Sequence, residues 1–212
     1  MRDDLVAWLA EPRFRAFAER HRDKIRRKVR SAGDAEGLRD VRAELALAER
    51  LLADRRFEIT YEPYGSGRLG PDFGVTFRGR PAFNVEVTRP RPRPEVVDLG
   101  RTVAGKLRQL PPSVANVLVI DVGSDEVAGL DVGVAIRSLR QAVDARDASV
   151  LGRLGVTTPR AFYERFLRLA AVVVRAEAPL LATLWTNPSA RIAVPQPAAR
   201  ALVAALTEPS SG

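Results

Sequence analysis

The chain contains no cysteine, a single histidine and only three lysines. Without cysteine, disulfides and thiolate metal sites are excluded. The single histidine, His21, lies in a run of basic residues typical of a surface helix, so we do not expect catalysis of the Ser-His-Asp type. Long apolar runs are also lacking, because even residues 114–123 (VANVLVIDVG) are interrupted by Asp121 and fall short of the roughly 18 to 20 apolar residues that a membrane-spanning helix needs.

The remaining composition is typical of one globular domain. Hydrophobic residues make up 46% of the 212 residues and charged residues 28%, which is enough to bury one substantial core. Residues 1–14 carry acids and no apolar run of signal-peptide length, so we expect a cytoplasmic protein without a membrane partner. We expect residues 1–33 to form a basic helical segment packed on a domain of residues 34–207, followed by a tail of residues 208–212.

The formal net charge of +8 is the first indication of a partner. A phosphate backbone favours clustered cations, and the cations concentrate in residues 20–30 and 89–94. The alternative is that coding bias supplied the abundant arginine and that residues 20–30 form an ordinary solvated helix. If nucleic acid is the partner, the cations of the first cluster predicted to contact it are Lys24, Arg27 and Lys28.

The first half of the chain changes from helical to strand patterning. Apolar spacing predicts one or two helices over residues 2–30 and an amphipathic helix over residues 36–53, with Asp34 or Ala35 near its start. Three short alternating segments then predict a meander of strands, at residues 57–63, 72–77 and 82–88. Prolines exclude helix and central strand from residues 89–94.

The second half predicts helices alternating with buried strands. The near-continuous apolar run of residues 115–122 is typical of a strand buried on both faces. Around it, the sequence predicts helices at residues 97–110, 133–145, 159–169 and 197–206, strands at 171–175 and 180–187, and a short segment at 190–195. The order predicts an α/β fold, a mixed central sheet flanked by helices.

The hairpin between residues 72 and 88 carries the most informative acids. If its turn has three residues, 78–80, then Asp72 lies directly opposite Glu86. Residues so placed have Cβ atoms about 4.5 to 5.5 Å apart, and two like charges there destabilise a strand pair unless a cation neutralises them. Mg²⁺ is a cation that prefers carboxylate oxygens as ligands. A four-residue turn would put the acids on opposite faces unless a bulge restores the register.

The phase of the last strand of the meander gives it one polar face. Asn84, Glu86 and Thr88 point to one side of the sheet, and Phe83, Val85 and Val87 to the other. The apolar side is expected in the core. The polar side must meet water, a ligand or a covering helix, and an ordinary solvated face is the alternative to a metal site.

The order of these features resembles the PD-(D/E)XK nuclease superfamily, also called restriction-endonuclease-like. The resemblance covers residues 36–121: a helix with a glutamate (Glu44), a strand, Pro71-Asp72, a hairpin, Glu86-Val87-Thr88, a helix and a buried strand. The segment LWTNPSARIAVP (residues 184–195) also resembles bacterial members of that superfamily.

The resemblance implies roles for several residues. Asp72 and Glu86 would hold Mg²⁺ or Mn²⁺, with the Val87 carbonyl as a third ligand and Glu44 as an additional acid. Thr88 departs from the family pattern, because that position is usually the lysine that orients water and offsets phosphate charge.

Two interpretations of Thr88 remain open. In the first, the lysine role belongs to Lys106, with Gln109 on the same helical face. The chain would then be a metal-dependent phosphodiesterase acting on DNA, with Arg89, Arg91 and Arg93 on backbone phosphates. In the second, the domain is catalytically inactive and binds nucleic acid or regulates a partner. A structural protein with solvated acids is a third reading, and the sequence leaves a homodimer open.

Overall fold

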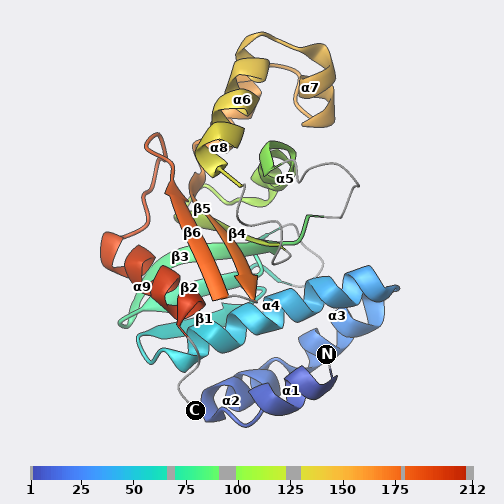
Figure 1. Cartoon of the computed structure of the whole chain (residues 1–212), viewed down its shortest axis with the longest axis vertical. Helices are drawn as coiled ribbons and strands as arrows, with labels where there is room; N and C mark the ends of the chain where they lie inside the picture. The colour runs from blue at the N-terminus through green and yellow to red at the C-terminus, as the bar shows by residue number, and fades with distance from the viewer. Residues whose placement is uncertain (1, 66–69, 91–98, 123–129, 178–179, 209–212) are drawn as a thin grey trace.

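The structure is a computed structural model that describes residues 2–65, 70–90, 99–122, 130–177 and 180–208 (Figure 1). Its centre is a six-stranded sheet whose strands follow one another in sequence order. The strands are β1 (Phe57–Tyr61), β2 (Phe73–Phe77), β3 (Arg80–Thr88), β4 (Asn116–Asp121), β5 (Leu169–Glu177) and β6 (Leu180–Thr186).

The sheet is mixed. Strands β1, β2 and β3 form an antiparallel meander, β3, β4 and β5 run parallel, and β6 returns antiparallel to β5. All six residues of β4 are buried, as expected for a parallel strand covered on both faces. The predicted α/β architecture, a mixed sheet flanked by helices, is therefore confirmed, and so is the meander.

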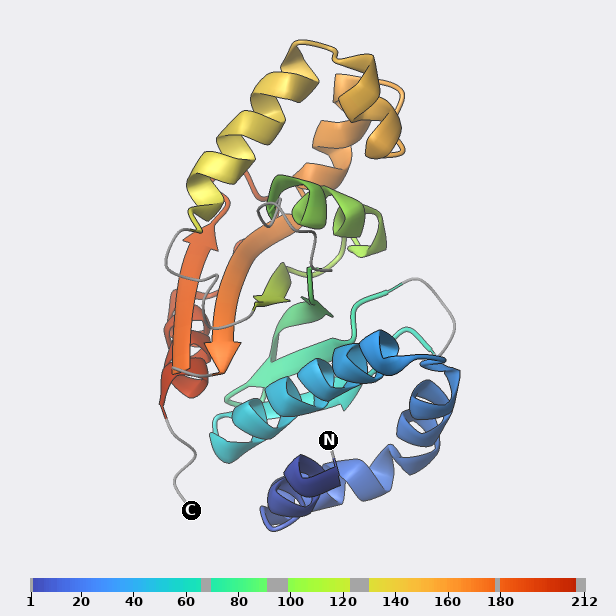
Figure 2. The same ribbon diagram turned by 45° about the vertical axis from the view of Figure 1, so that its right-hand side comes forward.

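Helices cover both faces of the sheet (Figures 1 and 2). One core joins α2 and α4 with the inner side chains of the meander, and α9 packs on β6 and α4. The opposite core joins α5, α6, α7 and α8 with the other face of β4 and β5. The helices are α1 (Arg2–Trp8), α2 (Pro12–Arg20), α3 (Arg22–Ser31), α4 (Ala35–Ala53), α5 (Leu99–Lys106), α6 (Val132–Asp144), α7 (Ala148–Arg153), α8 (Pro159–Phe166) and α9 (Gln196–Thr207).

The helix predictions were right in kind and wrong in some bounds. The long amphipathic helix begins where expected, because Asp34 accepts a hydrogen bond from the Gly37 backbone N–H at 2.7 Å and caps α4. Residues 2–30 form three helices instead of one or two, since Pro12 starts α2 and His21 separates α2 from α3. The short helix α7 was not predicted, and residues 190–195 form neither helix nor strand.

The hairpin reaches the expected register by a different route. The turn has neither of the two lengths considered from the sequence: it has two residues, Arg78 (φ 51°) and Gly79 (φ 74°), and Phe77 pairs with Arg80. Two positive φ values suit the tight turns that match strand twist. A bulge between Val75 and Thr76 then shifts the pairing by one residue, so that Phe73 pairs with Val85 and the next residue on each strand is Asp72 and Glu86.

In the described part of the chain, no helix combines the length and the apolar character needed to cross a membrane.

Candidate active site

Three acids and two lysines meet where β2 begins and β3 ends, and we call them the acid–lysine cluster. Asp72 precedes β2, Glu86 lies in β3 and Glu44 comes from α4, while the lysines come from α3 (Lys28) and α5 (Lys106). All five line a pocket of about 390 Å³ that also includes Val87, Thr88 and Arg89. A smaller pocket of about 170 Å³ includes Asp72, Glu86 and Lys28 with Tyr64 and Gln109.

Asp72 is fixed through both carboxylate oxygens. Its Oδ2 accepts a hydrogen bond from the Val87 backbone N–H at 2.9 Å, and its Oδ1 accepts one from Lys28 Nζ at 3.0 Å. The N–H and C=O of one strand residue point toward the same edge of the strand, so the Val87 carbonyl is directed to the side on which Asp72 lies. Asp72 and Val87 also line the same pocket.

Glu86 is buried with half of its carboxylate unused. The residue is 4% exposed, and its Oε1 accepts a hydrogen bond from Lys106 Nζ at 2.8 Å. Its Oε2 is buried and has no hydrogen-bond partner among the described residues. Burial, and then the charge of Asp72, raise the pKa of Glu86 to about 7, although Lys106 opposes the shift. A buried carboxylate oxygen without a partner is costly, and a cation beside Asp72 would satisfy it.

Glu44 reaches the cluster from α4, which covers the face of the sheet opposite to the face on which Glu86 lies. It is 6% exposed, and its Oε2 accepts hydrogen bonds from Lys28 Nζ at 2.6 Å and from the Tyr61 hydroxyl at 2.8 Å. Burial, and then the charge of Asp72, raise the pKa of Glu44 to about 8, while Lys28 and the hydrogen bond from Tyr61 lower it. The structure thus brings together the three acids that the resemblance singled out.

Lys28 lies inside the site, a position that sequence reasoning missed. It was predicted to contact nucleic acid from a basic helix, yet its ammonium bridges Glu44 and Asp72. Burial opposes the charge of Lys28, but Asp72 and then Glu44 outweigh burial, so the pKa of Lys28 lies above its usual value. The sequence pattern of residues 20–30 marked the cations without showing which of them face α4 and the acids.

The other predicted cations have different surroundings. Lys24 Nζ donates hydrogen bonds to the backbone carbonyls of Tyr61 at 2.8 Å and Glu62 at 3.1 Å. Arg27 is exposed on α3. The predicted phosphate contacts Arg91 and Arg93 lie outside the described residues.

Lys106 contacts one of the acids and Gln109 lines a pocket with two of them, although the two residues do not share one regular helix. Lys106 is the last residue of α5, and Gln109 ends the 3-10 turn that follows (Leu107–Gln109). Lys106 binds Glu86, and Gln109 lines the smaller pocket with Asp72 and Glu86. Both residues are therefore placed where a group bound to the acids would meet them.

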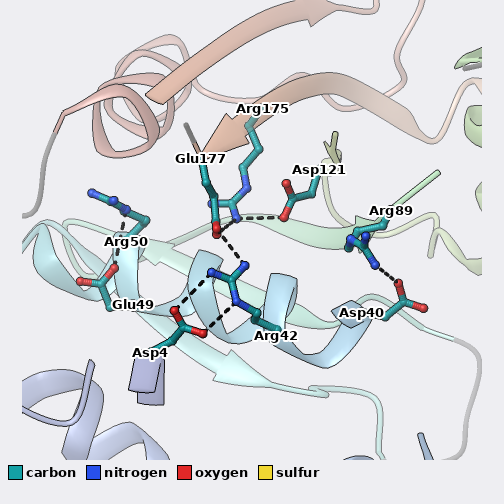
Figure 3. A network of polar contacts seen from close by, with 9 residues as sticks. All are labelled: Asp4, Asp40, Arg42, Glu49, Arg50, Arg89, Asp121, Arg175 and Glu177. Atoms are coloured by element: carbon teal, nitrogen blue, oxygen red, sulfur yellow. Dashed lines mark hydrogen bonds and ion pairs between the residues drawn. The ribbon is translucent and has the colours of Figure 1, made fainter. Parts of the chain in front are cut away.

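Thr88 and Arg89 complete the wall of the larger pocket. Thr88 follows Glu86 by two residues and shares its face of the strand, as predicted. Arg89 points the other way, toward α4, and lies 3.4 Å from Glu36 and 3.5 Å from Asp40 (Figure 3 shows its contact with Asp40). Arg89 is thus held at the pocket by acids of α4.

Another acidic residue, Asp121, has a structural partner. It accepts a hydrogen bond at 3.0 Å from buried Arg175, which also contacts Glu177 (Figure 3). Glu177 in turn binds Arg42 of α4, and Arg42 binds Asp4 of α1. This network links α1 and α4 to the ends of β4 and β5. Asp125 and Glu126, which follow Asp121 in the sequence, lie outside the described residues.

The donors available for a metal are few and all are oxygens. In the part of the chain that the structure describes, no three or more His, Cys, Asp or Glu side chains lie in one group that could hold a metal ion. Asp72 and Glu86 provide two carboxylates in a pocket that Val87 also lines. Mg²⁺ is commonly bound by one or two carboxylates, with water in the remaining positions, so this donor set fits Mg²⁺ or Mn²⁺.

Comparison with known proteins found no matching family model, no matching curated protein and no matching solved structure.

Proposed function

We propose that the chain is a metal-dependent nuclease with a restriction-endonuclease-like fold, which hydrolyses phosphodiester bonds in DNA. The observation that carries the proposal is the buried Oε2 of Glu86. This oxygen has no hydrogen-bond donor in the described structure, and Glu86 also lies close enough to Asp72 for the two negative charges to repel. Two acids held together at such a cost are expected where a cation or a reaction needs them. The resemblance of residues 36–121 to PD-(D/E)XK nucleases agrees with this assignment.

Asp72, Glu86 and the Val87 carbonyl would hold Mg²⁺ or Mn²⁺. When bound, such an ion polarises a phosphate oxygen and lowers the pKa of a water molecule. The contribution of the protein is to fix the two carboxylates. The Val87 N–H orients Asp72, and Lys106 holds one oxygen of Glu86 while the other stays available.

Lys106 would perform the work that Thr88 cannot. Its ammonium is 2.8 Å from Glu86 Oε1, close enough to orient an attacking water or to offset charge on the phosphate. Gln109, in the adjoining pocket, would donate a hydrogen bond to the same water or phosphate. Arg89 also lines the larger pocket and would contact the DNA backbone.

A second candidate function is a catalytically inactive domain that binds nucleic acid or regulates a partner. Thr88 favours it, because an uncharged side chain lines the pocket where the resemblance expects a lysine. The two candidates share the fold and differ in whether Lys106 supplies the missing function.

Cleavage assays separate these candidates. Purified protein would be incubated with supercoiled DNA, linear DNA, single-stranded DNA and RNA, each with Mg²⁺, Mn²⁺ or a chelator. We expect metal-dependent cutting of DNA that Asp72→Asn abolishes and that Lys106→Met lowers by about 10²-fold or more. The matched control is Asp144→Asn, because Asp144 is also a hydrogen-bonded acid, bound to the Tyr163 hydroxyl on α8, and lies outside both site pockets.

Each outcome of the cleavage assays supports or contradicts one of the candidates. Binding without cutting, under every metal condition, would favour the inactive domain. Cutting that survives Asp72→Asn would show that the acids are not the active site.

A further inference from the structure

We infer that Lys28 is a built-in competitor of the divalent metal, occupying the acids in the metal-free chain and withdrawing when a metal binds. This inference rests on the proposed function, because it concerns the same acids. It adds a regulatory element, α3, to a site otherwise formed by α4, α5 and the hairpin.

The contacts of Lys28 are those of a cation in a cation site. Its Nζ lies 2.6 Å from Glu44 Oε2 and 3.0 Å from Asp72 Oδ1. It bridges carboxylates from two different elements, and its side chain is only 27% exposed. A divalent ion that binds Asp72 would have to share an oxygen with the ammonium, and like charges at such distances repel strongly in a partly buried site.

The helix that carries Lys28 is attached in a way that permits withdrawal. No residue of α3 is buried, and only Ile25 and Val29 pack partly against the core. Toward the domain, α3 presents Lys24 and Lys28, which lie one turn apart and bind carbonyl and carboxylate oxygens. Polar contacts of this kind exchange readily with water or with another cation, whereas a buried apolar face would not.

Lys106 and Lys28 differ in which carboxylate oxygens they occupy. Lys106 Nζ lies 2.8 Å from Oε1 of Glu86, and the buried Oε2, which has no hydrogen-bond partner among the described residues, is left for another cation. By contrast, both oxygens of Asp72 already accept hydrogen bonds, one of them from Lys28. Asp72 is therefore the acid at which competition occurs, and Lys28 is the competitor.

The consequence is a site whose metal affinity is set by α3. Any event that draws Lys28 away from Glu44 and Asp72 raises that affinity, and metal binding in turn releases Lys28 into the pocket that it already lines. This is reciprocal coupling between one helix and one ion.

Mn²⁺ binding measures the competition without relying on catalysis. The dissociation constant would be determined by titration calorimetry at fixed pH and ionic strength for the full chain and for Lys28→Met, which keeps the aliphatic stem and removes the charge. Loss of a charge-assisted contact to two acids should tighten Mn²⁺ binding by about tenfold or more. Lys28→Arg keeps the charge and should give no tightening.

The control separates competition from general electrostatics. Arg26→Met also removes one positive charge from α3, but Arg26 is exposed and lines neither site pocket. It should leave Mn²⁺ affinity unchanged within about twofold. Thermal unfolding of every variant in chelator establishes that each is folded.

The outcomes distinguish this inference from the proposed function. If Mn²⁺ binding is abolished by Asp72→Asn but is unchanged or weakened by Lys28→Met, Lys28 is not a competitor and the metal site stands. If neither the unaltered chain nor Lys28→Met binds Mn²⁺, or if binding ignores Asp72→Asn, the metal site itself is wrong and the inference fails with it.

Discussion

Glu44 and Glu86 are buried acids whose ionisation opposes folding when no metal is present. Burial and the neighbouring charge of Asp72 raise the pKa of Glu44 to about 8 and that of Glu86 to about 7, from a usual value of 4.5. The folded chain therefore binds more protons than the unfolded chain between pH 4.5 and about pH 8. The stabilising effect of that protonation is complete below pH 4.5 and is lost as the pH rises through 7 and 8.

This linkage predicts a pH-dependent stability that depends on Glu44. In chelator, the melting temperature should fall as the pH is raised from 6 to 9. Glu44→Gln removes one of the two raised groups and should make the fall shallower, as should saturating Mn²⁺. Differential scanning fluorimetry across this range provides the measurement. An identical pH slope in Glu44→Gln would mean that Glu44 does not titrate in this way.

Sequence reasoning at the residue scale identified the acids better than the cations. Asp72 and Glu86 were singled out by the expected pairing of the hairpin strands and then by the resemblance, and Glu44 by the resemblance alone. The contacts of Lys28 with two acids were not predicted, because they depend on how α3 packs against α4. No local pattern encodes the contact between residues that are 16 and 44 positions apart in the sequence.

At the element scale, the backbones of α3 and α4 approach closely at the corner between these two helices. Gly37 lies in the first turn of α4, and a Cβ built there would be 2.2 Å from the carbonyl oxygen of Ala32, which caps α3. A glycine inside a helix is usually replaced by alanine with a gain in stability. At this position the two backbones approach too closely for a methyl group.

We therefore predict that Gly37→Ala destabilises the chain by about 1 to 3 kcal/mol, because the Ala32 carbonyl must move. Gly152→Ala in α7 is the matched control. A Cβ at Gly152 meets no atom within 4 Å, so this change should instead stabilise by about 0.5 to 1 kcal/mol. Urea unfolding measures both. Equal effects of the two substitutions would refute the close approach.

The hairpin shows what a sequence can determine at this scale and what it cannot. The alternation of β3 correctly placed Glu86 and Thr88 on one face, since strand periodicity is a local property. The turn has two residues and not three or four, and the bulge between Val75 and Thr76 restores the register that brings Asp72 and Glu86 together. A bulge depends on the packing of both strands, so the register could be stated from sequence only as a condition.

At the scale of the whole molecule, two cores share the same central strands. Val117 and Val119 of β4 pack in the core with α4, while Leu118 and Ile120 pack in the core with α5 and α6. Trp8 packs against the first core and Trp185 against the second, and the chain has no other tryptophan. Each core thus has its own fluorescent reporter.

Shared strands predict one cooperative unfolding transition. Single-tryptophan variants, Trp8→Phe and Trp185→Phe, should give coincident urea midpoints once the small effect of each substitution is allowed for. Leu47→Ala, in the first core only, should lower the unfolding free energy by about 2 to 5 kcal/mol by both reporters. If Leu47→Ala shifted the Trp8 signal alone, the two layers would be separate folding units.

The overall architecture was predictable because periodicity and turn residues report local structure, and a buried parallel strand such as β4 has an unmistakable composition. The helical region after β4 was predicted only in part. Helix α7 spans six residues, which is too short for a periodic pattern.

The central claim is that Asp72 and Glu86 together hold a divalent ion, and anomalous diffraction from Mn²⁺-soaked crystals tests it most directly. We predict a peak at coordination distance, about 2 Å, from both carboxylates, with Glu86 Oε2 as a ligand and Lys28 displaced from Asp72. A fully occupied Mn²⁺ bound elsewhere, with Glu86 Oε2 still without a ligand and Lys28 still on Asp72, would contradict the account.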